Sequence, residues 1–113
     1  MTAREALYHQ EVLILAYTYL HPEELKELEN NDFSFVATKQ MFMIMAANYN
    51  RNNQEFVNGH EIIEAMAKNK RFNNLLSHDD LILRVLSCHE DYIVGKAIFD
   101  GWIRYIREKR DKL

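Results

Sequence analysis

Cysteine, proline and glycine are all scarce in this chain of 113 residues. Cys88 is the only cysteine, which excludes an intramolecular disulfide and every zinc site that needs several cysteines. The single proline leaves few breaks, and no stretch alternates apolar and polar residues as a half-buried strand does. The three glycines stand apart, so the sequence contains no glycine-rich phosphate loop. These absences favour helices throughout the chain.

Two further absences bear on where the protein works. No run approaches the roughly 18 apolar residues that span a bilayer, and the first residues lack the basic and apolar regions of a signal peptide. The net charge of -3 is not the basic excess that binding to nucleic acid requires. With the lone cysteine, these features predict a protein of the reducing cytoplasm that enters no membrane and binds no nucleic acid strongly by itself.

Apolar and aromatic side chains are abundant, at 48% and 12% of residues, which is enough for one small core. We expect an all-α bundle of six to seven helices that ends in one long C-terminal helix. Residues 7–20 and 37–49 are apolar around most of a helical circumference, which places both segments in the middle of the bundle. The helices are predicted at about residues 3–19, 22–29, 36–49, 58–68, 72–76, 77–87 and 91–112.

Several helix starts carry capping boxes, in which a polar N-cap residue is followed three residues later by an acid. The pairs that fit this pattern are Thr2 with Glu5, Asn58 with Glu61, and Ser77 with Asp80. Asp91 is the predicted cap of the last helix. On the helix that follows Asn58, the side chains of Ile62, Ile63 and Met66 are expected to face the core.

Charges of opposite sign gather in two segments. Residues 23–32 hold five acidic side chains, and residues 104–112 hold five basic ones. We therefore predict two local patches of opposite charge. The charged side chains of the last helix, including Arg107, are expected to face water.

The last helix carries more apolar surface than one core contact needs. On a helical wheel, one apolar ridge consists of Tyr92, Phe99, Ile103 and Ile106, and the other of Val94, Ile98, Trp102 and Tyr105. One ridge suffices for the bundle, so the second is predicted to pack on another element or on a partner. The candidate partner-binding residues are Ile98, Trp102, Tyr105, Arg107 and Arg110. Core packing is the alternative for Trp102.

No catalytic or metal-binding motif is complete. Residues 60–64 begin like the zinc-protease motif HExxH, but Glu64 stands in place of the second histidine. The five histidines lack the spacing that gathers metal ligands on a helix, and the adjacent side chains of Cys88 and His89 diverge. We therefore predict a domain without catalytic residues, metal or cofactor.

The order of these segments follows a recognisable plan. An apolar first helix in LYHQEVLILAYTYLHPE (7–23) precedes a short helix, a step at Phe33 to Phe35, a second apolar helix and a polar turn at 50–59. The chain closes with an acidic step and a long helix in SCHEDYIVGKAIFDGWIRYIREKR (87–110). This plan resembles the C-terminal, helicase-interacting domain of bacterial DNA primase.

The resemblance implies that residues 1–113 form a single helicase-binding domain, which is a fragment of a larger primase and has no activity of its own. It implies a monomer that docks on the N-terminal collar of the hexameric replicative helicase (DnaB type) in the bacterial cytoplasm. Docking would tether primer synthesis to the unwinding fork. In this family the last helix leads into a helical hairpin that supplies much of the helicase contact, and we expect that hairpin to be partly or wholly missing here.

Two other interpretations stay open. The N-terminal domain of the same helicase shares this helical plan, including the step at Asp32 and Phe33 followed by a helix that contains an aromatic residue, here Phe42. Such a domain pairs with itself, whereas the primase domain is expected to be monomeric. The third interpretation is a small metal-dependent enzyme built on a helical bundle, which a metal titration would test.

Overall fold

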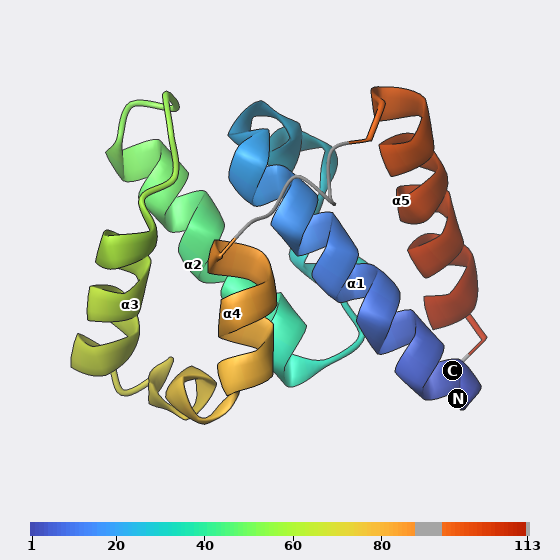
Figure 1. Cartoon of the computed structure of the whole chain (residues 1–113), viewed down its shortest axis with the longest axis horizontal. Coiled ribbons are helices and arrows are strands. Elements are labelled where there is room, and N and C mark those ends of the chain that lie inside the picture. The colour runs from blue at the N-terminus through green and yellow to red at the C-terminus, as the bar shows by residue number, and fades with distance from the viewer. Residues whose placement is uncertain (88–93, 113) are drawn as a thin grey trace.

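A computed structural model describes residues 1–87 and 94–112 of the chain, and these form the predicted all-α bundle (Figure 1). The helices of the described residues are α1 (Ala3–Leu20), η1 (Pro22–Glu27), η2 (Asn30–Asp32), α2 (Val36–Arg51), α3 (Gly59–Lys68), η3 (Asn73–Ser77), α4 (Asp79–Leu86) and α5 (Lys96–Arg110), of which those labelled η are 3₁₀ helices. Each predicted helix has a counterpart in this series. A single 3₁₀ turn, η2, also forms at the polar break after residue 29.

Helix α1 lies in the middle of the bundle, between α5 on one side and α2 and α4 on the other (Figure 1). Val12, Ile14 and Leu15 are completely buried. The Thr18 hydroxyl is buried as well, and it donates a hydrogen bond of 2.9 Å to the carbonyl of Leu15. The second half of α1 is thus almost wholly enclosed, since Leu13 and Tyr19 are half-buried and only Leu20, at its end, is exposed.

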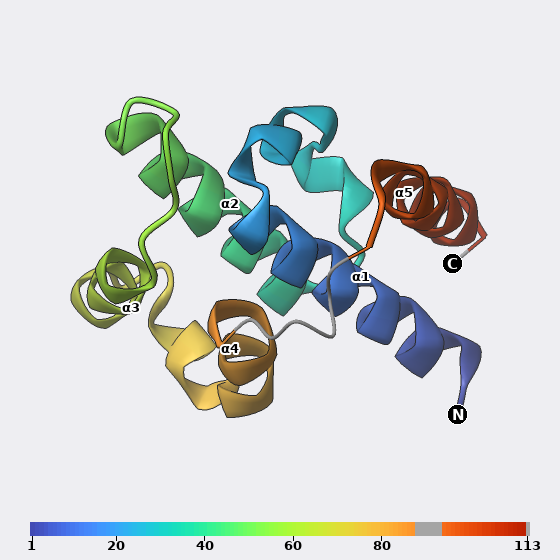
Figure 2. The ribbon, with the colours of Figure 1, turned by 45° about the horizontal axis from the view of Figure 1, so that its top comes forward.

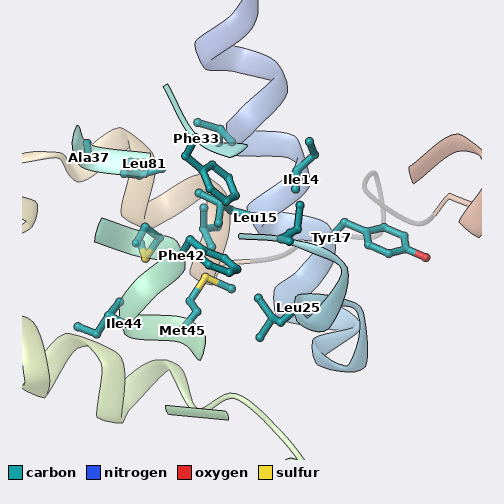
Figure 3. Close-up of a cluster of buried hydrophobic side chains, with 14 of the residues drawn as sticks. Ile14, Leu15, Tyr17, Leu25, Phe33, Ala37, Phe42, Ile44, Met45 and Leu81 are labelled. Atoms are coloured by element: carbon teal, nitrogen blue, oxygen red, sulfur yellow. The ribbon is translucent and has the colours of Figure 1, made fainter. Parts of the chain in front are cut away.

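The main core lies between α1, α2 and the segment that joins them. Phe33 and Phe42 stack with ring centroids 5.1 Å apart, and Leu15 and Met45 lie beside them (Figure 3). Figure 3 also shows Tyr17 directed away from this cluster toward α5. The core therefore has two parts, one on each side of α1.

Helix α2 begins without a capping side chain of its own. The buried carboxylate of Glu11, on α1, lies at this end of α2, where it accepts hydrogen bonds from the Ser34 N–H just before the helix (3.0 and 3.2 Å) and from the Thr38 hydroxyl (2.6 Å). Burial raises the pKa of Glu11, and these hydrogen bonds and the Lys39 charge only partly oppose the rise. A carboxylate near a helix N-terminus is stabilised by the unpaired backbone N–H groups. Glu11 thus ties α2 to α1.

Two of the predicted N-caps are confirmed. The Thr2 side chain accepts a hydrogen bond of 3.0 Å from the Glu5 N–H, and the Asn58 side chain accepts one of 3.2 Å from the Glu61 N–H. Both bonds satisfy an N–H group that has no partner inside its helix.

The predicted capping box of Ser77 with Asp80 is wrong. Helix α4 begins at Asp79, and no side chain caps it. The 3₁₀ helix η3 extends to Ser77, whose hydroxyl donates to the Asn74 carbonyl at 2.7 Å. Because Ser77 is the last residue of η3 and His78 holds the N-cap position of α4, the Ser77 hydroxyl is not placed to cap α4.

The predicted inward direction of Ile63 is also wrong. Ile62 and Met66, four residues apart, are completely buried on one face of α3. Ile63 is 37% exposed, because its position is turned by about 100° from that face. It lines a groove between α3 and α4 instead.

Helix α5 begins later than predicted. Its first residue is Lys96, preceded by Gly95 as N-cap, whereas the sequence predicts a cap at Asp91, which lies outside the described residues. With 15 residues it is shorter than α1, which has 18, so α5 is not the longest helix. It packs on α1 and η2 and lies at the edge of the bundle (Figure 2).

Candidate functional site

One apolar ridge of α5 belongs to the core. Phe99, Ile103 and Ile106 are buried, and we call them the inner ridge. The Phe99 ring stacks on the ring of Tyr17 with centroids 4.2 Å apart and an interplanar angle of 16°. These contacts confirm the predicted core ridge, except for Tyr92, which lies outside the described residues.

Two arginines bind the last turns of α5 to η2. Arg107 donates to both oxygens of the Asp32 carboxylate at 2.8 and 3.0 Å, and Arg110 donates to Oδ1 at 2.8 Å. The Glu29 backbone N–H adds a bond of 2.8 Å to Oδ2. Asp32 is only 1% exposed, so the acid-rich and base-rich segments of the sequence meet at a buried ion pair. We call these three charged residues the Asp32 cluster.

The electrostatics of the Asp32 cluster keep its carboxylate charged. Burial alone would raise the pKa of Asp32. The hydrogen bonds from Arg107 and the Glu29 backbone, with the charge of Arg110, hold that pKa below its ordinary value. A buried carboxylate is tolerated only with such partners. The cluster therefore fixes α5 on the bundle at neutral pH.

Arg107 and Arg110 also bond to backbone carbonyls. Arg107 donates to the Glu27 carbonyl at 2.8 Å, and Arg110 donates to the Asn31 carbonyl at 2.6 Å. Much of the donor capacity of both guanidinium groups is thus used inside the molecule. The expectation that Arg107 faces only water is wrong, because its guanidinium group closes over Asp32. Both arginines therefore belong to the attachment of α5 to the bundle.

The first turn of α5 is also tied to the bundle by charge. Lys96 lies 2.7 Å from the Glu24 carboxylate and 3.6 Å from the Asp100 carboxylate. With about 100° between successive residues, Lys96, Asp100 and Arg107 share one flank of the helix. That charged flank faces the 3₁₀ helices η1 and η2.

The second apolar ridge lies on the opposite flank. Ile98, Trp102 and Tyr105, which we call the outer ridge, follow one another at helical spacing. Ile98 is 53% exposed, and the two aromatic side chains are half-buried. The indole of Trp102 meets the Tyr17 ring edge-on with centroids 6.4 Å apart. Trp102 therefore contributes to both the core and the surface.

Two cations lie next to the outer ridge, and both belong to the basic segment 104–112, but neither was predicted as a partner-binding residue. The Lys109 ammonium lies 5.6 Å from the centroid of the Tyr105 ring, and Arg104 is exposed. The spacing of four residues between Tyr105 and Lys109 is a signal for their contact on a helix. Val94, which the sequence places on the same ridge, precedes α5 and is half-buried.

A second apolar surface lies between α3 and α4. The groove has a volume of about 590 Å³, and its exposed apolar side chains are Phe56, Ile63 and Leu83. Its walls carry aliphatic side chains and the aromatic rings of Tyr19 and Phe56 but, among the described residues, no tryptophan or arginine. Protein interfaces draw most of their binding energy from Trp, Tyr and Arg, whereas Leu is under-represented among such residues. The outer ridge is thus the stronger candidate.

The residues that resemble a zinc motif have a structural role. The Glu61 carboxylate accepts hydrogen bonds from the side-chain amides of Asn48 (2.9 Å) and Asn52 (3.0 Å). Both bonds hold the pKa of Glu61 below its usual range. They join the end of α2 to the start of α3. In the described ranges, no three His, Cys, Asp or Glu side chains gather closely enough to hold a metal ion.

Comparisons with known proteins do not identify a family. No protein-family model, curated protein or solved structure matches the chain. Of the helices in residues 1–87 and 94–112, none combines the length and the apolar character needed to cross a membrane. The resemblance to the primase domain therefore stays a prediction, which the surface of α5 makes testable.

Proposed function

We propose that this chain is a protein-docking domain that binds its partner through the outer ridge of α5. The observation that carries the proposal is the outer ridge itself, in which the exposed side chain of Ile98 continues into the half-buried rings of Trp102 and Tyr105. Rigid aromatic side chains bury a large area with little loss of conformational freedom, which is why Trp and Tyr are enriched at interfaces.

The support of α5 suits this role. The inner ridge packs on α1, and the Asp32 cluster holds the C-terminal turns. Because both attachments lie on other faces of the helix, the outer ridge is presented in a fixed orientation. A preorganised surface binds with a smaller entropic cost than a mobile one.

We propose further that the partner is the hexameric replicative helicase and that the chain is the helicase-binding domain of a bacterial DNA primase. The order of the helical segments supports this identity, because it resembles that domain from residue 7 to residue 110. In this role the domain is a monomer that catalyses nothing and tethers primer synthesis to the unwinding fork.

Calorimetric titration of the chain with a hexameric bacterial replicative helicase tests the proposal. We expect saturable binding that Ile98→Ala and Trp102→Ala each weaken at least tenfold while circular dichroism shows an intact helical fold. A wild-type chain that does not bind the helicase would refute the identity of the partner.

Self-association is the second candidate function, because an exposed apolar ridge also suits the pairing of two copies. Light scattering across a concentration series distinguishes the two. A monomer supports the primase interpretation. A dimer that Ile98→Ala dissociates would instead support the N-terminal collar domain of the helicase.

A further inference from the structure

The surroundings of the outer ridge indicate the chemistry of its partner, an inference that rests on the proposed docking function. We propose that the ridge binds a helix whose apolar side chains are flanked by carboxylates. Three observations support this occupant: the cations beside the ridge, a glycine on the outer face of α5, and the shallow surface that small residues leave there.

Two cations next to the ridge have no carboxylate partner among the described residues. Arg104 is exposed, and the Lys109 ammonium lies over the ring of Tyr105. The other basic groups of α5 are paired inside the molecule, namely Lys96 with Glu24, Arg107 with Asp32, and Arg110 with Asp32. The exposed carboxylate of Glu108, on the same face, is paired with Lys112 at 3.3 Å. The unpaired charge beside the outer ridge is thus positive, and carboxylates on a partner complement it.

Gly101 stands on the outer face between Arg104 and the ridge, and the fold does not require it. Its φ is not positive, and an added Cβ would meet only the Arg104 guanidinium, at the ordinary contact distance of 3.7 Å. Glycine nevertheless weakens a helix interior relative to alanine. No contact inside the molecule accounts for this loss of stability at Gly101. A close approach of a partner's backbone to this position would account for it.

The geometry of the surface beside the outer ridge favours a helix as the partner. With about 100° between residues, Gly101 lies nearly opposite the inner ridge, and Ala97 precedes it by one turn on the same face. The surface between Arg104 and the ridge is therefore shallow over a full turn of α5. A helix lying in it packs apolar side chains on Ile98 and Tyr105 and places its acidic flank near the two cations.

Trp102 makes the proposal measurable because it is the only tryptophan of the chain. Two synthetic amphipathic peptides of about 20 residues serve as probes, identical in their leucine stripe but carrying either Glu or Lys at the flanking positions. We expect the fluorescence of Trp102 to change on titration with the Glu peptide, and that peptide to bind at least tenfold more tightly than the Lys peptide. Equal affinities, or tighter binding of the Lys peptide, would overturn the proposal.

Substitutions on α5 distinguish specific binding of an acidic helix from non-specific hydrophobic binding. Arg104→Gln is expected to weaken binding of the Glu peptide about fivefold, whereas Arg51→Gln, at an exposed position on α2, leaves it unchanged. Gly101→Ala is expected to raise the melting temperature while weakening binding at least fivefold. A purely structural role for Gly101 predicts the first effect without the second, and that result would contradict the close approach.

The helicase distinguishes failure of this inference from failure of the proposed function. Helicase binding that Ile98→Ala abolishes but that Arg104→Gln and Gly101→Ala leave unchanged would keep the docking function and reject the acidic partner helix. Discrimination between the peptides by a chain that does not bind the helicase would support the partner chemistry and reject the helicase as the partner.

Discussion

The inner and outer ridges of α5 are made of similar residues but meet different surroundings. Phe99, Ile103 and Ile106 are buried, whereas Ile98 is exposed and its aromatic neighbours are half-buried. Apolar character alone does not decide which ridge faces the core, because each combines isoleucine with aromatic rings. The charges decide it, since the Asp32 cluster and the contact between Lys96 and Glu24 fix the rotation of the helix about its axis.

This comparison gives the buried ion pair a specific purpose. Two apolar ridges permit two rotations of α5, and in either one a large apolar area is buried. Only the observed rotation brings both Arg107 and Arg110 onto Asp32. Buried ionic groups are best known for selecting one register among alternatives, and here the register determines which ridge is offered to a partner.

The largest expected loss of stability comes from truncating a side chain of the inner ridge. Phe99→Ala removes the ring that stacks on Tyr17, and we expect it to lower the free energy of unfolding by about 3–5 kcal/mol. Urea denaturation followed by circular dichroism measures this. Phe99→Leu, which keeps most of the volume, is the milder control at about 1.5 kcal/mol. A loss below about 1 kcal/mol for Phe99→Ala would contradict its place in the core.

The next effect comes from neutralising the buried carboxylate. Asp32→Asn leaves two arginines without their charged acceptor, and we expect a loss of about 1–3 kcal/mol, moderated because both guanidinium groups are partly exposed. The fluorescence emission of Trp102 is expected to shift as α5 loses its fixed rotation. Glu24→Gln, which removes a pair with a half-exposed lysine, should lower the stability less than Asp32→Asn does. A larger loss for Glu24→Gln than for Asp32→Asn would overturn the assigned importance of the cluster.

Acid is expected to weaken the attachment of α5. Because the pKa of Asp32 is lower in the folded chain than in the unfolded one, its contribution to stability is present above about pH 4 and is lost as the pH falls through the folded pKa. Urea denaturation between pH 2.5 and 7, at points of about half a unit, should show a shallower acid loss for Asp32→Asn than for the wild type.

Glu11 provides a control of opposite sign. Its pKa is raised on folding, so its contribution is present below about pH 4 and is lost as the pH rises through the folded pKa. The stability of the wild type relative to Glu11→Gln should therefore increase as the pH falls. The same direction of change for Asp32→Asn and Glu11→Gln would contradict the opposite environments of these two carboxylates.

The smallest effect on stability is expected at the outer ridge. Ile98→Ala should change the free energy of unfolding by no more than about 0.5 kcal/mol, because half of this side chain is already in water. Leu83→Ala, at a similarly exposed position on α4, should behave alike. Denaturation of both variants beside Phe99→Ala sharpens the contrast between the ridges. A loss at Ile98 above about 1.5 kcal/mol would show that it is a core residue.

Local patterns in the sequence predicted much of this fold. The helical period separates Phe99 and Ile106 from Ile98 without knowledge of any neighbour, and the N-caps Thr2 and Asn58 lie within three residues of their partners. The burial of α1 follows similarly, because a helix that is apolar on every side has no other place in a small bundle.

Contacts between residues far apart in the sequence could not be predicted from such local patterns. Arg107 and Asp32 are 75 positions apart, and Glu11 reaches Thr38 over 27 positions. The sequence therefore predicted a solvent-facing side chain for Arg107 and no structural role for Glu11. The direction of Ile63 on α3 shows the same limit. The helical period allows this side chain to face either the core or α4, and only the position of α4 decides between the two.

The most direct test of the docking surface compares two matched variants. Ile98→Ala and Leu83→Ala each truncate an exposed aliphatic side chain on a helix, but only Ile98 lies on the outer ridge. Titration of both chains with the hexameric replicative helicase is predicted to give at least a tenfold loss of affinity for Ile98→Ala and wild-type affinity for Leu83→Ala. Equal affinities of the two variants, or a greater loss for Leu83→Ala, would contradict the assignment of the outer ridge as the docking surface.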